Sequence, residues 1–214
     1  MITLAVFDIA GTTVEEHNLV YAALGDAVRA VRATPTTQDI ERWMGADKRE
    51  AISALIGSTD RKEIEDIFLD FRDRLDDYYD ATPPTPLHGV SELFRDLRAN
   101  GVQIALTTGF DDSITTPLLE RLGWNNGTVD AVVCADDVPS GRPAPYMIFR
   151  AMERTGVTDV RNVLTAGDTP RDVLAGLSAG AGRVVGVRTG GLPTEALQLE
   201  SRVEVLGSLA DLVV

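Results

Sequence analysis

The stretch Phe7-Asp8-Ile9-Ala10-Gly11-Thr12-Thr13 decides the fold of this chain of 214 residues. An apolar run over residues 2–7 leads into it, and such a run is typical of a buried parallel strand. A carboxylate at the end of such a strand lies at the sheet edge where open α/β sheets bind their ligands. Asp8 is therefore interpreted either as a nucleophile or metal ligand, or as a turn or helix-capping residue. The stretch by itself favours neither interpretation.

Helical spacing replaces the strand pattern after Thr13. Four amphipathic helices are expected between residues 15 and 79, with no strand among them. Their predicted positions are residues 19–34, 39–44, 48–56 and, after the capping residue Asp60, 61–79. A linker with three prolines, residues 81–86, follows the last of them.

Strands and helices alternate from Gly89 onward. Strands are predicted over residues 102–106, 129–133, 162–165, 184–187 and 203–206, and helices over residues 90–99, 112–122, 143–155 and 170–179. This alternation predicts an α/β fold with a doubly wound parallel sheet and an inserted all-α cap subdomain. The α/β core is expected to comprise residues 1–13 and 87–214, and the helical cap with its linkers residues 14–86.

The composition limits the classes of partner. A formal net charge of −13 argues against nucleic acid, but one helix N-terminus and a few cations suffice to bind a small phosphate. The single cysteine, Cys134, ends an apolar run and is predicted to be an inert core residue, which suits a reducing compartment. No basic segment precedes the N-terminal apolar run, and no apolar segment approaches the ~20 residues of a membrane span. We expect a cytoplasmic protein without a signal peptide or membrane contact.

Carboxylates follow two of the expected strands. Asp8 ends the first, and Asp168 follows the strand over residues 162–165, so the two should meet at one sheet edge. Mg²⁺ is usually held by a few carboxylates together with waters and substrate oxygens. Asp172, one turn beyond Asp168, can orient a metal-bound water or can be a solvated helix residue. These residues predict a magnesium site, with both interpretations of Asp172 left open.

Groups that suit a phosphoryl ligand follow two other segments at the same edge. The Thr108 hydroxyl and the Gly109 amide can donate hydrogen bonds to phosphoryl oxygens, and Arg142 supplies a positive charge. Two of these residues also have a simpler structural interpretation: Thr108 can be a helix cap and Arg142 a surface cation. Thr169, which follows Asp168, can likewise be a helix cap. Their joint occurrence at strand ends favours a phosphate site.

This order of motifs resembles that of the haloacid dehalogenase superfamily over the whole chain, with residues 14–81 matching its inserted helical cap. The resemblance implies that Asp8 is the nucleophile of an aspartyl-phosphate intermediate. It also implies Mg²⁺ held by Asp8, the Ala10 carbonyl and Asp168, with Asp172 beside them. The further residues that it implies for catalysis or substrate binding are Thr12, Met44, Thr108, Gly109 and Arg142.

The residue two positions beyond the nucleophile departs from the phosphatases of this superfamily. They have a second aspartate there, which protonates the leaving alcohol, whereas this chain has Ala10. General acid catalysis typically contributes ~10²–10⁴ in rate, or roughly 3–5 kcal/mol of barrier. Either the leaving group needs no acid, or another residue supplies it.

One branch of the superfamily has alanine at this position. Phosphonoacetaldehyde hydrolases (phosphonatases) have aspartate-x-Ala-Gly-Thr at the nucleophile, Met-Gly-x-x-Lys in the cap, and Arg-Pro in place of the usual Lys-Pro. The present chain resembles them in Asp8-Ile9-Ala10-Gly11-Thr12, Met44-Gly45-Ala46-Asp47-Lys48 and Gly141-Arg142-Pro143. The family's lysine forms an imine with the substrate aldehyde, so the carbon leaves as an enamine. The resemblance therefore implies that Lys48 is catalytic.

Lysine is rare in this chain, where Lys48 and Lys62 are the only lysines among 20 basic residues, and arginine cannot form an imine. Imine chemistry requires the pKa of Lys48 to fall well below the reference value of ~10.4. A solvated lysine in the first turn of a cap helix is the alternative. The family also has a histidine three residues after its lysine, where this chain has Ala51. His17 is a weak candidate to take over the proton transfer that this histidine performs during imine formation.

Three functions are therefore considered. The first is Mg²⁺-dependent hydrolysis of a C–P bond, in phosphonoacetaldehyde or a related small phosphono-aldehyde or ketone, through Lys48. The second is hydrolysis of a small phosphate ester such as phosphoglycolate, and the third is a regulatory or phosphate-binding role with weakened catalysis. In each case the partner is a small phosphate or phosphonate, and a homodimer is left open.

Overall fold

The computed structural model describes residues 1–31 and 34–213 of the chain. The chain divides into two compact units. Met1–Glu15 and Thr85–Val214 form one of them, here called the α/β unit, and Glu16–Pro84 form the other, here called the helical unit. Each unit is described by itself below.

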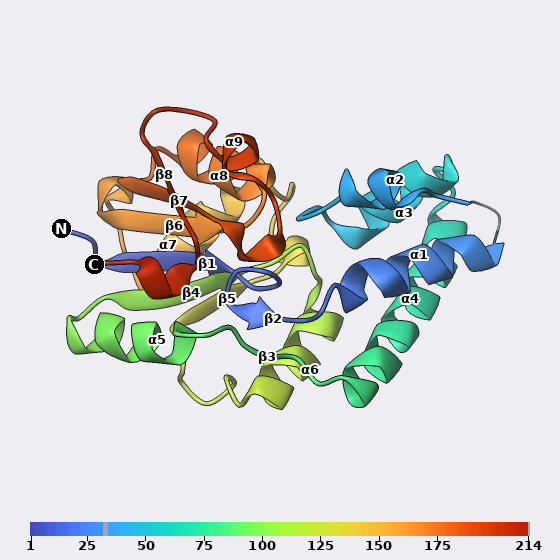
Figure 1. The fold of residues 1–214 in the computed structure, drawn as a ribbon, viewed down its shortest axis with the longest axis horizontal. Helices are drawn as coiled ribbons and strands as arrows, with labels where there is room; N and C mark the ends of the chain where they lie inside the picture. Colours follow the sequence, from blue (N-terminus) through green and yellow to red (C-terminus); the bar gives the residue numbers. More distant parts are fainter. Residues whose placement is uncertain (32–33, 214) are drawn as a thin grey trace. The chain divides into compact units, whose positions relative to one another are not determined.

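The α/β unit is built on a six-stranded sheet in which neighbouring strands run parallel. Its strands are β1 (Leu4–Asp8), β4 (Gln103–Thr107), β5 (Ala131–Val133), β6 (Val163–Gly167), β7 (Arg183–Val187) and β8 (Val203–Leu206). Their order is β5-β4-β1-β6-β7-β8 (Figure 1), so β1 lies where the strand order reverses. Open α/β sheets bind their ligands at that point. The predicted doubly wound parallel sheet is confirmed.

Helices cover both faces of this sheet because β1 is apolar on both sides. The helices of the unit are α5 (Val90–Ala99), α6 (Asp112–Leu122), α7 (Tyr146–Thr155), α8 (Pro170–Ala179) and the short α9 (Thr194–Leu197). Leu4 of β1 packs with Met147 of α7 and Ala175 of α8. Phe7, which points to the opposite face, stacks on Phe94 of α5 with the ring centroids 5.9 Å apart. The unbroken apolar run before Asp8 therefore has the two-sided burial that a central parallel strand requires.

The helical unit contains, within its described residues, α1 (Leu19–Val31), α2 (Thr37–Glu41), α3 (Lys48–Ile56) and α4 (Arg61–Ala81) (Figure 1). The Tyr78 hydroxyl of α4 donates a hydrogen bond to Asp26 of α1 at 2.8 Å. Arg49 of α3 forms an ion pair with Glu65 of α4 at 2.7 Å. The Asp60 carboxylate caps the start of α4, as predicted.

The second predicted helix was placed wrongly. It was expected over residues 39–44 but spans Thr37–Glu41, because Thr36 and Asp39 form a capping box that starts it earlier. The first helix was expected to end near Thr34; that end adjoins residues 32–33, which lie outside the described residues.

The helix expected from Pro143 begins instead at Tyr146. Pro145 is its capping residue, and a proline disfavours the helical conformation in the residue before it, here Ala144. The helix therefore starts beyond Pro145.

The prediction of no strand over residues 15–79 is wrong only at Glu15, which belongs to a short ribbon that flanks the helical segment. Val14–Glu15 (β2) and Thr85–Pro86 (β3) pair as a two-stranded antiparallel ribbon. Each strand has two residues, which is too short for an alternating pattern, and Pro86 cannot donate a ladder hydrogen bond.

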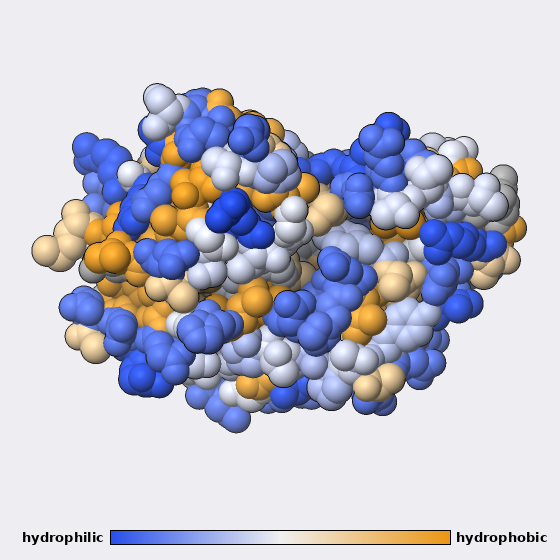
Figure 2. Space-filling model, in the orientation of Figure 1, coloured by the Kyte–Doolittle hydropathy of each residue, from blue (hydrophilic) through white to orange (hydrophobic). Residues whose placement is uncertain are grey.

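The surface is mixed in character. Figure 2 shows hydrophilic side chains spread over the face in view, with apolar side chains gathered over parts of the α/β unit. No helix within residues 1–31 or 34–213 combines the length and the apolar character needed to cross a bilayer.

Candidate active site

The turn after β1 is fixed by its own backbone. The Ile9 carbonyl accepts hydrogen bonds from the amides of Thr13 and Val14, both at 2.9 Å, and the Thr13 hydroxyl donates to the Asp8 carbonyl at 3.0 Å. Gly11 has a φ of +81°, a conformation that favours glycine. The sequence Asp8-to-Val14 therefore folds into one rigid turn that presents the Asp8 side chain at the sheet edge.

Three carboxylates meet at that edge, from β1, from the end of β6 and from the first turn of α8. Oxygen atoms of Asp8, Asp168 and Asp172 all lie within 4.8 Å of one another. Their exposed fractions are 6%, 3% and 8%. The structure thus brings together the three carboxylates on which the predicted magnesium site depends, and the alternative of a solvated Asp172 is wrong.

Arg142 lies inside this carboxylate cluster. It is 5% exposed, so the alternative of a surface cation is wrong. Its Nη1 donates to Asp8 Oδ1 at 2.5 Å and also to Asp172 Oδ1. The Arg171 guanidinium in turn donates to the Arg142 carbonyl at 3.1 Å. With all three carboxylates ionised, three negative charges face one positive charge, which leaves an excess of two negative charges.

Asp172 is held from its other side by the start of α8. Its Oδ2 accepts hydrogen bonds from the Thr169 hydroxyl and from the Thr169 amide, the latter at 3.1 Å. Thr169 and Asp172 form a capping box, so the interpretation of Thr169 as a helix cap is confirmed. The same contacts fix the orientation of Asp172 toward Asp8 and Arg142.

Burial and mutual repulsion shift the carboxyl groups of the cluster. Burial raises the pKa of Asp8 from 3.8 to about 6, an effect that Arg142 opposes and Asp172 reinforces. Burial, followed by the charges of Asp8 and Asp172, also raises the pKa of Asp168 well above its ordinary value. The positive charge of Arg142 is therefore too small to balance the negative charge of the three carboxylates.

A divalent cation fits this donor set. Hard carboxylate oxygens are the ligands that Mg²⁺ prefers, and two positive charges would balance the excess of two negative charges. Such a cation would also remove the repulsion that raises the pKa of Asp168. The buried triad can thus hold a metal ion.

The raised pKa of Asp8 predicts how the metal-free protein responds to pH. A carboxyl with a pKa of about 6 in the folded chain and 3.8 as its ordinary value stabilises the fold at low pH, and this contribution is lost as the pH rises through about 6. The loss for Asp8 is of the order of 3 kcal/mol. The melting temperature of the metal-free protein should therefore fall as the pH rises from about 4 to about 6.5, and Mg²⁺ should raise it more at the higher pH.

Thermal melts followed by circular dichroism, with and without Mg²⁺, measure both effects. Asp8→Asn is the matched control, because it keeps the size of the side chain and removes the titrating carboxyl. An equally steep pH dependence in Asp8→Asn would assign the effect to other groups.

Thr108 and Gly109 leave the sheet beside Asp8. The register pairs Asp8 with Thr107, the last residue of β4, so the two residues that follow Thr107 start at the same edge. Thr108 is 3% exposed, and its hydroxyl accepts a hydrogen bond from the Phe110 amide at 3.1 Å. This placement agrees with a phosphoryl-binding role, which stays a prediction.

Thr12 lies against the carboxylate cluster. Its hydroxyl is buried and donates to Asp168 Oδ1 at 3.1 Å. Sequence reasoning assigned Thr12 to the substrate and missed this contact. It also missed Gly190, which lies against Asp168, and Thr189, which contacts the Gly11 carbonyl; both lie in the turn after β7 and belong to no recognisable motif.

The remaining predicted residues belong to the helical unit. Lys48, the first residue of α3, is 3% exposed, so its interpretation as a solvated lysine is wrong. Its Nζ donates to the Ala46 carbonyl at 3.0 Å. Met44 is half-buried, and Ala51 is fully buried one turn along α3. His17 is exposed, with a φ of +57°.

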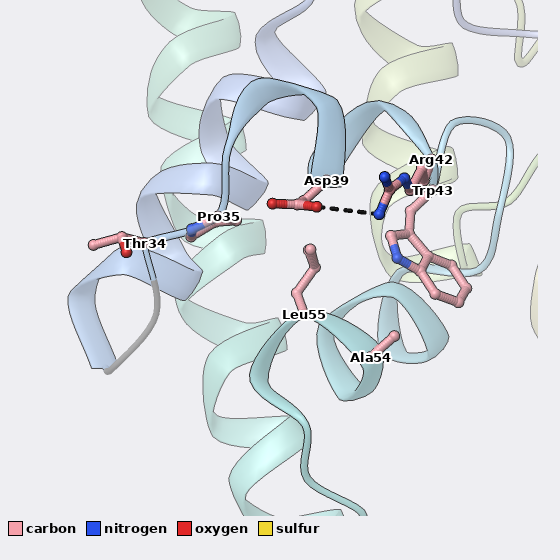
Figure 3. Close-up of a pocket in the computed structure, with 7 residues that line it drawn as sticks. All are labelled: Thr34, Pro35, Asp39, Arg42, Trp43, Ala54 and Leu55. Atoms are coloured by element: carbon pink, nitrogen blue, oxygen red, sulfur yellow. Dashed lines mark hydrogen bonds and ion pairs between the residues drawn. The ribbon is translucent and has the colours of Figure 1, made fainter.

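A hollow of about 500 Å³ lies within the helical unit. Its lining residues are Thr34, Pro35, Asp39, Arg42, Trp43, Ala54 and Leu55 (Figure 3). Asp39 and Arg42 form an ion pair across its rim at 3.3 Å. Trp43 is half-buried and lines this hollow.

Cys134 has no reactive character. It is buried, as predicted, and burial raises the pKa of its thiol to about 11. The thiol is therefore protonated at neutral pH, and only the thiolate is a good nucleophile.

Proteins of known family share both sequence and fold with this chain. A family model described as a haloacid dehalogenase-like hydrolase matches residues 2–180. Phosphonoacetaldehyde hydrolase of Paraburkholderia phytofirmans is 26% identical over 204 residues, which are 87% of this chain and 74% of that protein. The enzyme of the same name from Bacillus cereus is 32% identical over 124 residues, 56% of this chain and 47% of that protein. The match therefore spans about half the length of this Bacillus relative.

Solved structures share the fold. A haloacid dehalogenase-like hydrolase from Bacteroides fragilis superposes with a TM-score of 0.86, at 20% identity and with 100% of both chains covered. A phosphonoacetaldehyde hydrolase-like protein from Oleispira antarctica has a TM-score of 0.83 at 22% identity, with 98% of this chain and 89% of that chain covered.

The family model matches most of the chain. The structure agrees with this match, because it has a doubly wound sheet whose first strand ends in a buried aspartate. The triad of carboxylates at this edge can hold the metal ion on which such a hydrolase depends. The chain therefore belongs to the haloacid dehalogenase-like hydrolases and is an enzyme of that family.

Proposed function

We propose that this hydrolase cleaves the C–P bond of phosphonoacetaldehyde or a related small phosphono-aldehyde. In this proposal Asp8 is the nucleophile toward phosphorus, and Lys48 forms an imine with the carbonyl group of the substrate. The relatives named phosphonoacetaldehyde hydrolase support it.

The burial of Lys48 is the observation that carries the proposal. Lysine is almost never fully buried without a reason, yet Lys48 is 3% exposed, whereas the side chain of Lys62 is 83% exposed. Lys48 also opens α3, where the helix dipole disfavours a cation. The uncharged amine is the form that attacks an aldehyde, so the proposal requires Lys48 to lose its proton before the imine forms.

Ala10 supports the same chemistry. A methyl group cannot protonate a leaving alcohol, so this position is poorly suited to ordinary ester hydrolysis. In a C–P hydrolase the leaving group is carbon, and an imine accepts its electron pair.

The proposed reaction balances in four steps. The Lys48 amine and the aldehyde form an imine and release water. An Asp8 carboxylate oxygen then attacks phosphorus, the C–P bond breaks, and its electron pair moves into the imine to give an enamine. The enamine takes up a proton, and water hydrolyses the resulting imine to release acetaldehyde. A second water hydrolyses the aspartyl phosphate to phosphate.

The other residues of the site serve charge and orientation. We assign the proposed Mg²⁺ to Asp8, Asp168 and the Ala10 carbonyl, with Asp172 beside them; it would neutralise charge on the phosphoryl group. Arg142, which already contacts Asp8, can bind a phosphoryl oxygen, and Thr108 and the Gly109 amide can donate to others.

Borohydride trapping tests the imine. The protein is incubated with phosphonoacetaldehyde and sodium borohydride, and its peptides are mapped by mass spectrometry. The expected result is a reduced two-carbon adduct on Lys48 that is absent in Lys48→Arg. The chain has only two lysines, so Lys62→Arg is a matched control and should retain the adduct. Failure to trap Lys48 while C–P cleavage proceeds would contradict the proposal.

Ala51 favours a second candidate function, hydrolysis of a small phosphate ester. The residue is fully buried and replaces the histidine that phosphonatases have three residues after their lysine. Phosphate release from phosphoglycolate, at a rate that Lys48→Arg leaves unchanged and with no release from phosphonoacetaldehyde, would favour this second function.

A further inference from the structure

The Asp168 carboxylate is enclosed by two loops from distant parts of the sequence. One is the turn at Gly11 and Thr12 after β1, and the other is the single 3₁₀ turn Arg188–Gly190 after β7. Asp168 itself is 3% exposed. These loops therefore decide which orientations its side chain can adopt.

One carboxylate oxygen is held by a hydrogen bond and the other by close packing. The buried Thr12 hydroxyl donates to Oδ1 at 3.1 Å. A methyl group built on Gly190 would lie 1.8 Å from Oδ2, and one built on Gly11 would lie 2.6 Å from it, whereas real Cβ atoms essentially never come within 3.0 Å. Only glycine at position 190 leaves room for the carboxylate in this orientation.

The turn that carries Gly190 is fastened to the turn after β1. The Thr189 hydroxyl donates to the Gly11 carbonyl at 2.5 Å, across 178 positions of sequence. The φ angle of Gly190 is outside the positive range, so the demand for glycine there comes from space and not from backbone conformation. Thr189 thus keeps Gly190 against the carboxylate.

We propose that Thr189 and Gly190 are positioning residues for Asp168 as a metal ligand. The inference rests on the proposed function, in which Asp168 binds Mg²⁺. Thr12 holds one oxygen, and Gly190 prevents the carboxylate from rotating about that hydrogen bond. A ligand oriented before the cation binds loses no rotamer freedom on binding, and partners of this kind typically alter metal affinity by about 10–100-fold.

Metal binding by the full chain tests the proposal without reference to turnover. Mn²⁺ alone serves as the probe, with its free concentration measured by electron paramagnetic resonance. Gly190→Ala should raise the dissociation constant at least about tenfold, because the new methyl displaces Oδ2. Thr189→Val, which keeps the volume and removes the donor, should also weaken binding, and Thr189→Ser should restore it.

Gly191→Ala is the control within the same loop. No heavy atom lies within 4 Å of the methyl it would add, but its φ of +87° is strained for alanine. It should lower the melting temperature and leave Mn²⁺ affinity unchanged. Saturating metal should restore turnover in Gly190→Ala and Thr189→Val, which a damaged fold would not allow.

One result would overturn the inference alone, and another would overturn it together with the proposed metal site, so the two failures are distinguishable. Unchanged Mn²⁺ affinity in Gly190→Ala or in Thr189→Val would remove the positioning role and leave the metal site intact. If Gly190→Ala does not fold, the Thr189→Val and Thr189→Ser pair decides. Absence of Mn²⁺ binding by the unsubstituted chain would overturn the metal site and this inference with it.

Discussion

Asp8→Asn should lower turnover of every phosphate or phosphonate substrate by at least about 10⁴-fold, because the amide cannot attack phosphorus. The carboxylate is the group at the end of β1 that can form an acyl phosphate, and Thr108 is a far weaker nucleophile without a base. Phosphate release in a coupled assay measures the loss. Quenching of the unsubstituted enzyme in acid should in addition leave a phosphorylated peptide containing residue 8, absent from the variant.

The fold should survive this substitution. Arg142 keeps its contact with Asp172, and the pKa of Asp8, about 6 in the metal-free protein, shows that burial of the charge opposes folding near neutral pH. Metal-free Asp8→Asn should therefore melt no lower than the unsubstituted chain at about pH 7.5. Undiminished turnover in a folded Asp8→Asn protein would refute a covalent route through this residue.

Lys48→Arg should lower C–P bond cleavage by at least about 10³-fold, because a guanidinium cannot form an imine. Without the imine, the carbon leaving group is an unstabilised carbanion. Steady-state release of phosphate from phosphonoacetaldehyde measures the effect.

Two controls separate the chemistry from damage to the helical unit. Lys62→Arg changes an exposed lysine on α4 and should leave cleavage unchanged. Hydrolysis of a phosphate ester, where it is detectable, should depend on Asp8 and not on Lys48. A Lys48→Arg enzyme that cleaves the C–P bond at the original rate would exclude an imine on Lys48.

Two of the three carboxylates of the site, Asp8 and Asp168, could be predicted because each lies at the end of a strand. Asp8 and Asp168 end apolar runs, and parallel strands bring such ends to one edge whatever the loops between them do. The roles of Arg142 and Thr108 were harder to predict, because Arg142 alone suits a surface position and Thr108 alone suits a helix cap. Their combined order in the sequence decided the interpretation, and the burial of Arg142 agrees with it.

The contacts of Thr189 and Gly190 could not be predicted in this way. Thr189 meets Gly11 across 178 positions, and neither Thr189 nor Gly190 is a residue type that signals metal binding. Glycine is needed at position 190 because the Asp168 side chain occupies the space that a Cβ atom would fill. A pattern of neighbouring residues in the sequence cannot show this contact. The burial of Lys48 was left open for a related reason: a lysine in the first turn of a helix is usually solvated.

The short strands β2 and β3 were not predicted, because two residues are too few to show the alternation of apolar and polar residues that indicates a strand. The ribbon of β2 and β3 contains two residues per strand, and one of them is Pro86. In contrast, α3 was predicted with its exact bounds, because Gly57 in the left-handed conformation ends it and leaves a clear signal.

The central place of β1 in the sheet has a consequence for synthesis on the ribosome. β1 emerges first, but its neighbours β4 and β6 begin at Gln103 and Val163, so the nascent chain must carry an apolar strand without a partner. The intervening segment Glu16–Pro84 makes its own internal contacts and can fold meanwhile. Asp168 and Asp172 are translated later still, so under the proposed mechanism Asp8 lacks its neighbouring carboxylates until residues 168–172 have been made.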